Sequence, residues 1–132
     1  SPKSNLCSKR GKDMSKKVIV IADDIEDVRQ AIMRTLGEDN FIFIEASSGE
    51  EAIKIVKGQK VDLILSDIAM PKGNGIELLE KLRAIDNPPK IILVTGYASM
   101  FSGSPSGVKP SAIIEKPYRA SDLVHLVDDV LK

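Results

Sequence analysis

Aromatic residues and cysteines are scarce in this chain of 132 residues, which has no tryptophan, two tyrosines, three phenylalanines and one cysteine. Because bases stack on aromatic side chains, this scarcity makes single-stranded nucleic acid an unexpected ligand. The single cysteine, Cys7, excludes an internal disulfide bond and a zinc site built from cysteines. No apolar run approaches the roughly 20 residues of a membrane span. We therefore expect a small cytoplasmic domain that does not contact a membrane.

The formal net charge is zero, but the charges are unevenly distributed along the chain. Residues 1–17 carry six basic side chains and one acidic side chain, so the remainder has an excess of acidic groups. A basic tail can bind nucleic acid or an anionic membrane, but a solvated tail without a function is the favoured interpretation. We expect a disordered basic tail over residues 1–17, with 1–13 a vector-derived remnant if Met14 is the native start. The folded domain is expected over residues 18–132.

The folded part alternates short apolar runs with helical patterns of apolar residues. The expected strands are 18–22, 41–44, 61–65, 91–94 and 112–114, and the expected helices are 26–36, 49–58, 76–85 and a last helix capped by Ser121. Runs that are apolar on both faces are typical of parallel strands covered by helices on each side. Strands that alternate with helices imply right-handed crossovers. The pattern therefore predicts an α/β fold of the (βα)5 type with a doubly wound, five-stranded parallel sheet.

Two segments carry more specific local signals. Ser48 and Glu51 have the spacing of a capping box at the start of the second helix. In residues 96–111, ten of the sixteen residues are glycine, serine or proline, where a fourth crossover helix is expected. Each of these residue types favours turns or interrupts helices. We therefore predict that the fourth helix is short or replaced by a loop.

Three carboxylates directly follow predicted strands. Asp23 and Asp24 come after the first strand, and Asp67 comes after the third. In open α/β sheets, ligands bind outside the carboxyl ends of the strands. If these two strands are neighbours, like charges repel by about 1 to 4 kcal/mol per pair, unless a cation neutralises them or their pKa values rise. Oxygen ligands without histidine or cysteine favour Mg²⁺ over zinc.

Thr95 and Lys116 follow the same rule, because each stands at the end of a predicted strand. Thr95 offers a hydroxyl group, and Lys116 offers a positive charge. An aspartate nucleophile, a divalent cation, a hydroxyl donor and a lysine together suit phosphoryl transfer onto a carboxylate. The cation and the lysine would spread the charge that develops on the phosphoryl oxygens.

Five short motifs occur in order along the chain: Asp23-Asp24, the stretch 65–71 around Asp67, Gly75, Thr95-Gly96 and Lys116-Pro117. Together they resemble the response-regulator receiver domains of two-component signalling, over residues 18–132. Asp-Asp or Lys-Pro alone is weak evidence, whereas all five motifs in register are strong evidence. The resemblance implies a flavodoxin-like sheet with strand order 2-1-3-4-5.

The resemblance also implies a role for each acidic residue. Asp67 would accept a phosphoryl group from a histidine of a partner kinase or a histidine phosphotransfer protein. Asp24, Asp67 and the backbone carbonyl of Ala69 would hold Mg²⁺, and Asp23 would reach the ion directly or through water. Such a domain is a signalling phosphoacceptor rather than an enzyme, because it catalyses only its own phosphorylation and dephosphorylation.

The remaining motif residues would complete the site. Thr95 would bond the phosphoryl group, and Lys116 would pair with it. Pro71 and Gly75 would shape the adjacent loop, and the family often has a cis peptide bond before the proline that corresponds to Pro117.

The sequence departs from the family pattern near the switch region. Many receivers have an aromatic residue three positions before the site lysine, where this chain has Ile113, although Tyr97 offers an aromatic ring in the loop. A Thr-Gly-Tyr stretch and a degenerate fourth helix resemble an atypical branch of the family, many members of which are attached to hybrid histidine kinases. These departures affect the switch face and leave the phosphorylation chemistry intact.

Two other function classes remain open at this point. A phosphatase or phosphomutase with an aspartyl-phosphate intermediate has a second acid two residues after the nucleophile, where this chain has Ala69. A phosphate-independent interaction module would not need five intact motifs. We expect a monomer or weak homodimer without nucleic-acid binding by this chain, and Glu45 is read as surface charge.

Overall fold

The computed structural model describes residues 16–70, 75–96 and 109–132 of the chain. The elements are β1 (Val18–Ala22), α3 (Glu26–Leu36), β2 (Ile42–Ala46), α4 (Gly49–Gly58), β3 (Leu63–Asp67), α5 (Gly75–Leu82), β4 (Lys90–Thr95), β5 (Ala112–Glu115) and α6 (Ala120–Leu131). Each predicted strand is present, with shifts of one or two residues at some ends. Within the described residues, no helix is long and apolar enough to cross a membrane.

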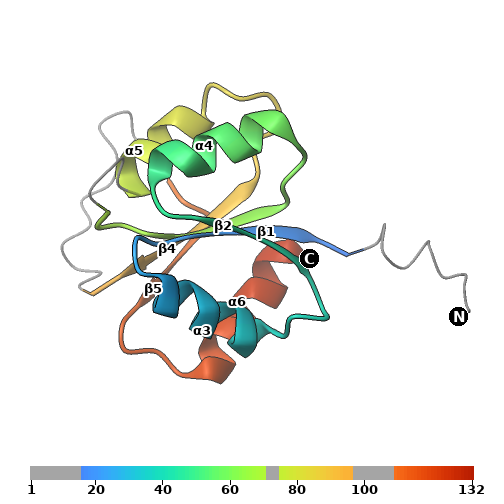
Figure 1. Cartoon of the computed structure of the whole chain (residues 1–132), viewed down its shortest axis with the longest axis vertical. Coiled ribbons are helices and arrows are strands. Elements are labelled where there is room, and N and C mark those ends of the chain that lie inside the picture. Colours follow the sequence, from blue (N-terminus) through green and yellow to red (C-terminus); the bar gives the residue numbers. More distant parts are fainter. Residues whose placement is uncertain (1–15, 71–74, 97–108) are drawn as a thin grey trace, which may run out of the picture.

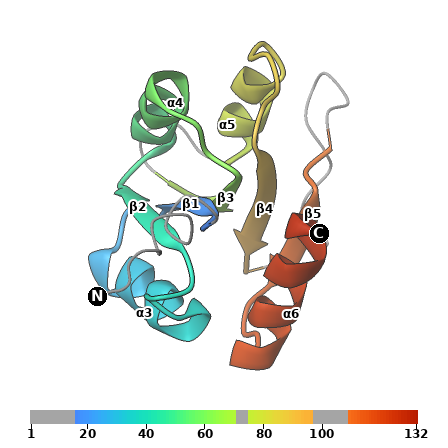
Figure 2. The same ribbon diagram turned by 90° about the vertical axis from the view of Figure 1, so that its right-hand side faces the viewer.

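The strands form one parallel sheet in the order β2-β1-β3-β4-β5, as Figure 2 shows from left to right. The predicted fold class and strand order are therefore confirmed. β1 lies between β2 and β3, and its Ile19, Val20 and Ile21 are fully buried. A strand of β-branched residues suits this position because its two faces both contact apolar side chains.

Two apolar layers hold helices on opposite faces of the sheet (Figure 1). Along β1, Val20 and Ala22 contact the layer beneath α4 and α5, whereas Ile19 and Ile21 contact the layer beneath α3 and α6. This division follows from the alternation of side chains along a strand. Helices on both faces leave the carboxyl ends of the strands as the open edge of the sheet.

The start of α4 agrees with its predicted cap, with one difference in detail. The Ser48 hydroxyl accepts a hydrogen bond from the Glu51 N–H at 3.1 Å. The Glu51 carboxylate accepts from the Ser47 N–H at 2.6 Å, one residue earlier than a capping box requires. The hydrogen bonds from the backbone and the side chain of Ser47 lower the pKa of Glu51.

The predicted cap of the last helix is wrong. α6 begins at Ala120, and Arg119 is its N-cap, so Ser121 lies inside the first turn and is exposed. The carboxylate of Asp122 accepts a hydrogen bond from the Arg119 N–H at 3.3 Å. An acid three residues after the N-cap can satisfy this N–H, so the serine is not needed there.

Two expectations fall largely on residues outside the described ranges. The short or missing fourth helix was predicted over residues 96–111, of which only 96 and 109–111 are described. The basic tail was predicted over residues 1–17, of which only Lys16 and Lys17 are described. Both expectations stay predictions, and so does the boundary of the domain at residue 18.

Gly75, the first residue of α5, lies directly against the end of β3. A Cβ atom at this position would be 2.9 Å from the Asp67 carbonyl oxygen and 2.9 Å from the Ile68 Cα. Both are backbone atoms that cannot move away as a flexible side chain can. The Gly75 N–H also donates to the Ile68 carbonyl at 2.9 Å. Glycine at this position therefore keeps α5 in contact with the strand end that carries Asp67.

We predict that Gly75→Ala lowers the free energy of unfolding by about 1 to 3 kcal/mol, because the added methyl group overpacks against backbone. Urea denaturation measures this change. The control is Gly58→Ala, where an added Cβ meets nothing within 4 Å. It should be neutral or slightly stabilising, because alanine favours a helix over glycine. Equal stability of Gly75→Ala and the parent protein would contradict the steric explanation.

Candidate functional site

The predicted site residues gather at the carboxyl edge of the sheet. Asp23 directly follows β1, Asp67 ends β3, Thr95 ends β4 and Lys116 directly follows β5. β1, β3, β4 and β5 are neighbours in that order, so parallel pairing brings these strand ends to one edge. The order of the strands thus joins residues that are up to 93 positions apart in the sequence.

Asp67 is held by contacts to both of its carboxylate oxygens. Oδ2 lies 3.4 Å from the Lys116 Nζ, and Oδ1 accepts a hydrogen bond from the Ala69 N–H at 3.1 Å. The side chain of Asp67 is 15% exposed, whereas that of Lys116 is 40% exposed. The carboxylate is therefore oriented by two neighbours and still accessible from solvent.

Asp23 is the buried acid of the site, with only 3% of the residue exposed. Its Oδ1 accepts a hydrogen bond from the Ile25 N–H at 2.9 Å. Burial is the main cause that raises the pKa of Asp23, and the charge of Asp67 and a hydrogen bond to its carboxylate raise it further. The Ile25 N–H and the charge of Lys116 act in the opposite direction. The two carboxyl groups therefore face each other and compete for ionisation.

Asp24 stands apart from this pair, because its residue is exposed at the surface. In the parts of the chain that the structure describes, no three side chains of the histidine, cysteine or acid types form a group that could hold a metal ion. The structure thus brings Asp23 and Asp67 together, and it does not bring Asp24 into the same cluster.

The donor set at this edge nevertheless fits a hard divalent cation. Two carboxylates face each other, with one lysine at 3.4 Å from Asp67 as the positive charge. The two carboxylates offer only oxygen atoms to a cation, and Mg²⁺ keeps several waters when one or two carboxylates bind it. Burial, together with the charge of Asp67, raises the pKa of Asp23, and a bound cation would favour its ionised form.

Thr95 and Lys116 are joined through the backbone. The Lys116 N–H donates to the Thr95 carbonyl at 2.8 Å, which extends the pairing of β4 and β5 by one step. Thr95 is buried, with 9% of the residue exposed. The peptide bond between Lys116 and Pro117 is cis, as the resemblance implied. Ala69 is exposed two residues after Asp67, and Pro71 lies outside the described residues.

Sequence reasoning missed three residues beside the site. Arg29 and Glu45 form an ion pair at 2.8 Å, although Glu45 was interpreted as surface charge. Tyr118 is half-buried, and burial raises the pKa of its hydroxyl group. No spacing rule links α3 to β2, so the ion pair could not be inferred before the sheet order was known.

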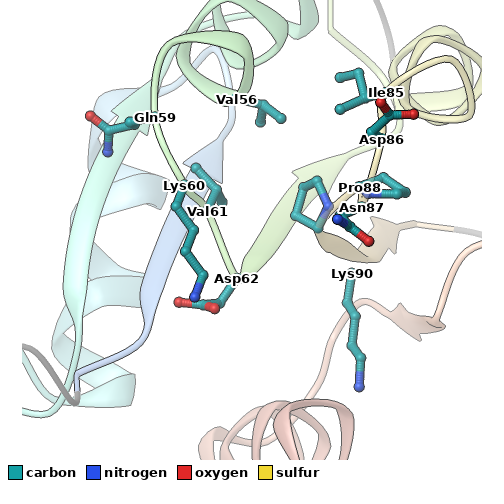
Figure 3. A pocket seen from close by; sticks show the side chains of 11 residues that line it. Val56, Gln59, Lys60, Val61, Asp62, Ile85, Asp86, Asn87, Pro88 and Lys90 are labelled. Carbon is teal, nitrogen blue, oxygen red and sulfur yellow. The ribbon is translucent and has the colours of Figure 1, made fainter.

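A cavity of about 510 Å³ lies elsewhere, at the amino ends of β3 and β4 (Figure 3). Asp62 and Lys90, which line it, precede or begin these strands. Their polar groups already have partners, because Asp62 accepts from the Val18 N–H at 2.8 Å and Lys90 donates to the Val130 carbonyl at 2.7 Å. Because Asp62 and Lys90 stand at the amino ends of their strands, the cavity lies at the opposite edge of the sheet from Asp67.

Comparison with known proteins shows the family of this chain. Residues 19–128 match the family of response regulator receiver domains. The chain belongs to this family. It is therefore a receiver domain of two-component signalling, as the five motifs indicated.

Curated relatives of this receiver domain include both short and long proteins. The response regulator receiver protein CpdR of Brucella abortus is 29% identical over 116 residues, which cover 87% of this chain and 97% of CpdR. The chemotaxis protein CheY of Halobacterium salinarum is 32% identical over 120 residues, or 89% and 98% of the two chains. The sensor kinase CckA of Brucella abortus is 31% identical over 117 residues, which are 86% of this chain and 12% of the kinase.

Solved structures share the fold. The response regulator TrrA of Thermotoga maritima, in complex with Mg²⁺ and BeF, has a TM-score of 0.77 at 30% identity, covering 87% of this chain and 99% of TrrA. The receiver domain of the hybrid histidine kinase CckA has a TM-score of 0.70 at 28% identity, with coverage of 87% and 99%.

We predict that Asp23→Asn stabilises the receiver domain at neutral pH without divalent cations. The fold raises the pKa of Asp23 above its ordinary 3.8, so the folded state binds the proton more tightly than the unfolded state. The contribution of Asp23 to stability therefore falls as the pH rises from about 3.8 through the raised pKa. Asparagine keeps the acceptor for the Ile25 N–H and removes the charge. The expected gain is on the order of 1 kcal/mol above that window and vanishes below it.

Urea unfolding in the presence of EDTA across this pH range measures the difference. The control, Asp39→Asn, removes one negative charge at an exposed position between α3 and β2. If Asp23→Asn gave the same profile as this control, the buried setting of Asp23 beside Asp67 would not be the cause.

Proposed function

We propose that Asp67 is the phosphoacceptor of this receiver domain and takes its phosphoryl group from a histidine of a partner protein. The observation that carries this proposal is the setting of Asp67: it ends β3, is 15% exposed, and contacts Lys116 at 3.4 Å. An accessible carboxylate beside a lysine, at the open edge of a parallel sheet, suits attack on a phosphorus atom.

In the proposed step, a carboxylate oxygen of Asp67 forms a bond to phosphorus while the bond between phosphorus and the histidine nitrogen breaks. The histidine leaves with the electron pair of that bond. Lys116 pairs with the charge on the phosphoryl oxygens, and the Thr95 hydroxyl binds one of them. Lys116 already contacts Asp67 before the reaction, so it needs no large movement to do so.

Asp23, Asp24, Asp67 and the Ala69 carbonyl are proposed to bind Mg²⁺. When bound, the cation supplies positive charge to the phosphoryl oxygens and neutralises the carboxylates. Asp23 and Asp67 already face each other, and exposed Asp24 is next to Asp23 in the chain. This proposal assigns Asp24 a role that requires its side chain to join the other two.

A signalling role is favoured over an independent enzyme. Ala69 occupies the position two residues after Asp67, where a phosphatase or phosphomutase would need a second acid, so this chain lacks that group. A phosphate-independent module does not require two acids to face each other against their repulsion. Coverage of 97% of CpdR and of 12% of CckA is compatible with either a stand-alone regulator or part of a hybrid kinase. The cytoplasmic location stays a prediction.

The partner is proposed to dock beside the acidic turn. Ile25 is 54% exposed and stands directly after Asp23 and Asp24, so it offers an apolar contact next to the acids. A groove of about 350 Å³ begins two residues further along the chain at Asp27, and it is lined by α3 residues together with Tyr118 and Ala120. A helix that carries the phosphohistidine could cover this apolar surface and present its phosphoryl group to Asp67. A small phosphodonor such as acetyl phosphate does not need this surface. A substitution there should therefore slow phosphoryl transfer from a protein and leave transfer from the small donor unchanged.

We predict that incubation with Mg²⁺ and acetyl phosphate adds the mass of one phosphoryl group to the parent protein and none to Asp67→Asn. Asparagine keeps the size of the side chain and removes the nucleophilic carboxylate, so loss of labelling reports chemistry. Intact-mass spectrometry measures the product. Labelling of Asp67→Asn would overturn the assignment. Multiple turnover of a phosphoester without a labelled protein would instead support the enzyme alternative.

Ile25→Ala is predicted to slow phosphoryl transfer from a phosphorylated histidine phosphotransfer protein about tenfold, because it removes the apolar side chain from the contact. Its labelling by acetyl phosphate should change less than twofold, because the substitution adds no charge beside the acids. The matched control is Ile42→Ala, at a second exposed isoleucine that begins β2, at the other end of the strands. Equal slowing with both donors would show that Ile25 acts on the site itself and not on docking.

A further inference from the structure

Arg29, in the first half of α3, contacts two groups outside its own helix. Its Nε lies 2.8 Å from the Glu45 Oε1, and its Nη1 donates a hydrogen bond to the Asp23 carbonyl oxygen at 2.6 Å. The Arg29 side chain is only 13% exposed. One guanidinium group thus bridges the acidic turn after β1 and the neighbouring outer strand β2.

The turn at Asp23 is restrained on several sides. The Asp23 N–H donates to the Ala46 carbonyl at 3.0 Å, and the Asp23 carboxylate accepts from the Ile25 N–H at 2.9 Å. The Arg29 contact fixes the remaining polar group of this residue, its carbonyl oxygen. That carbonyl belongs to the peptide unit between Asp23 and Asp24, so its direction sets the orientation of both residues.

Glu45 holds the arginine in place and also balances its charge. Glu45 pairs in register with Ile21 of β1, one step before Ala22, so it lies beside the end of that strand. Gln30 Nε2 donates to both Glu45 carboxylate oxygens at 3.2 Å, which fixes the carboxylate from a second side. A bare guanidinium next to a cation site would repel the cation. Its pairing with Glu45 reduces this repulsion.

We propose that Arg29 is a positioning residue for the divalent cation: it clamps the peptide between Asp23 and Asp24, and Glu45 neutralises its charge. This inference rests on the proposed function, since it assumes that these acids bind Mg²⁺. The planar fork of arginine reaches the carbonyl and the carboxylate at once with donors in fixed directions. Lysine carries the same charge on a single nitrogen and cannot reproduce both contacts in this geometry.

The test compares Arg29→Lys with the parent protein and with Arg34→Lys, an exposed arginine in the last turn of the same helix. Isothermal titration calorimetry gives the Mg²⁺ dissociation constant, and labelling by acetyl phosphate is followed at several Mg²⁺ concentrations. Arg29→Lys should weaken Mg²⁺ binding about tenfold, as expected for a residue that orients ligands. At saturating Mg²⁺ its labelling rate should return to within about twofold of the parent rate, because the clamp does not touch the phosphoryl group. Arg34→Lys should match the parent in both measurements.

Glu45→Gln tests the neutralisation of the Arg29 charge separately from the contact between Arg29 and the Asp23 carbonyl. It leaves Arg29 without its balancing charge, so Mg²⁺ binding should be weaker than in the parent protein at low salt, and this difference should shrink when both proteins are measured at about 1 M salt. The defect of Arg29→Lys should persist at both salt concentrations, since it is geometric. These two signatures do not arise from a general loss of stability.

Specific outcomes would overturn the inference. Unchanged Mg²⁺ affinity in Arg29→Lys would refute the clamp, and a defect in Glu45→Gln that ignores salt would refute the charge balance. A labelling rate of Arg29→Lys that stays low at saturating Mg²⁺ would also refute a role confined to the cation. If the parent protein itself bound no Mg²⁺, the proposed function would fail first, and this result is distinct from every variant-specific one.

Discussion

The burial of Asp23 beside a second carboxyl group, that of Asp67, is the constraint on which the rest of this site depends. Asp23 is almost completely buried, and the charge of Asp67 adds to the cost of ionising it. Lys116 offsets part of this cost, but it contacts Asp67 at 3.4 Å and is 40% exposed, so solvent weakens its effect. The fold therefore keeps an electrostatically unfavourable pair at an edge of the sheet that no helix among the described residues covers. Such a pair is a common sign of a functional site, because packing alone would not select it.

The sheet makes this arrangement possible by the order of its strands. β1 and β3 are neighbours, so the residues after their last pairs come together, while β4 and β5 bring Thr95 and Lys116 to the same edge. Gly75 lets α5 start in contact with the Asp67 backbone, where any larger residue would press on the strand end. The apolar layers hold the strands rigidly and leave the edge to polar groups. Asp67 and Thr95 are themselves the last residues of their strands, and Asp23 and Lys116 come directly after theirs, so the sheet positions all four.

Much of the fold could be predicted from the sequence because its signals are local. The run Val18–Ala22 contains only apolar residues, and it ends at two acids, so both the strand and the turn are visible in a few letters. The Ser48 cap was visible for the same reason. The cap at Arg119 was missed because serine is the more usual cap, and here an acid three residues later replaces it. In each case the residues that determine the local structure lie within a few positions of one another in the sequence.

The parts that could not be predicted depend on contacts across elements. Arg29 and Glu45 are 16 residues apart and belong to a helix and an outer strand, so only the folded sheet shows that they meet. The exposure of Asp24 next to buried Asp23 is likewise not encoded in residue spacing. In the proposed chemistry, the side chains of Asp23, Asp24 and Asp67 carry three negative charges and Lys116 carries one positive charge. One Mg²⁺ would cancel the two negative charges in excess. Phosphorylation of Asp67 would then add negative charge again, and Lys116 and Thr95 are the groups placed to respond. The response of the domain would therefore begin at the ends of β4 and β5, while Asp23 and Asp24 keep the cation in place.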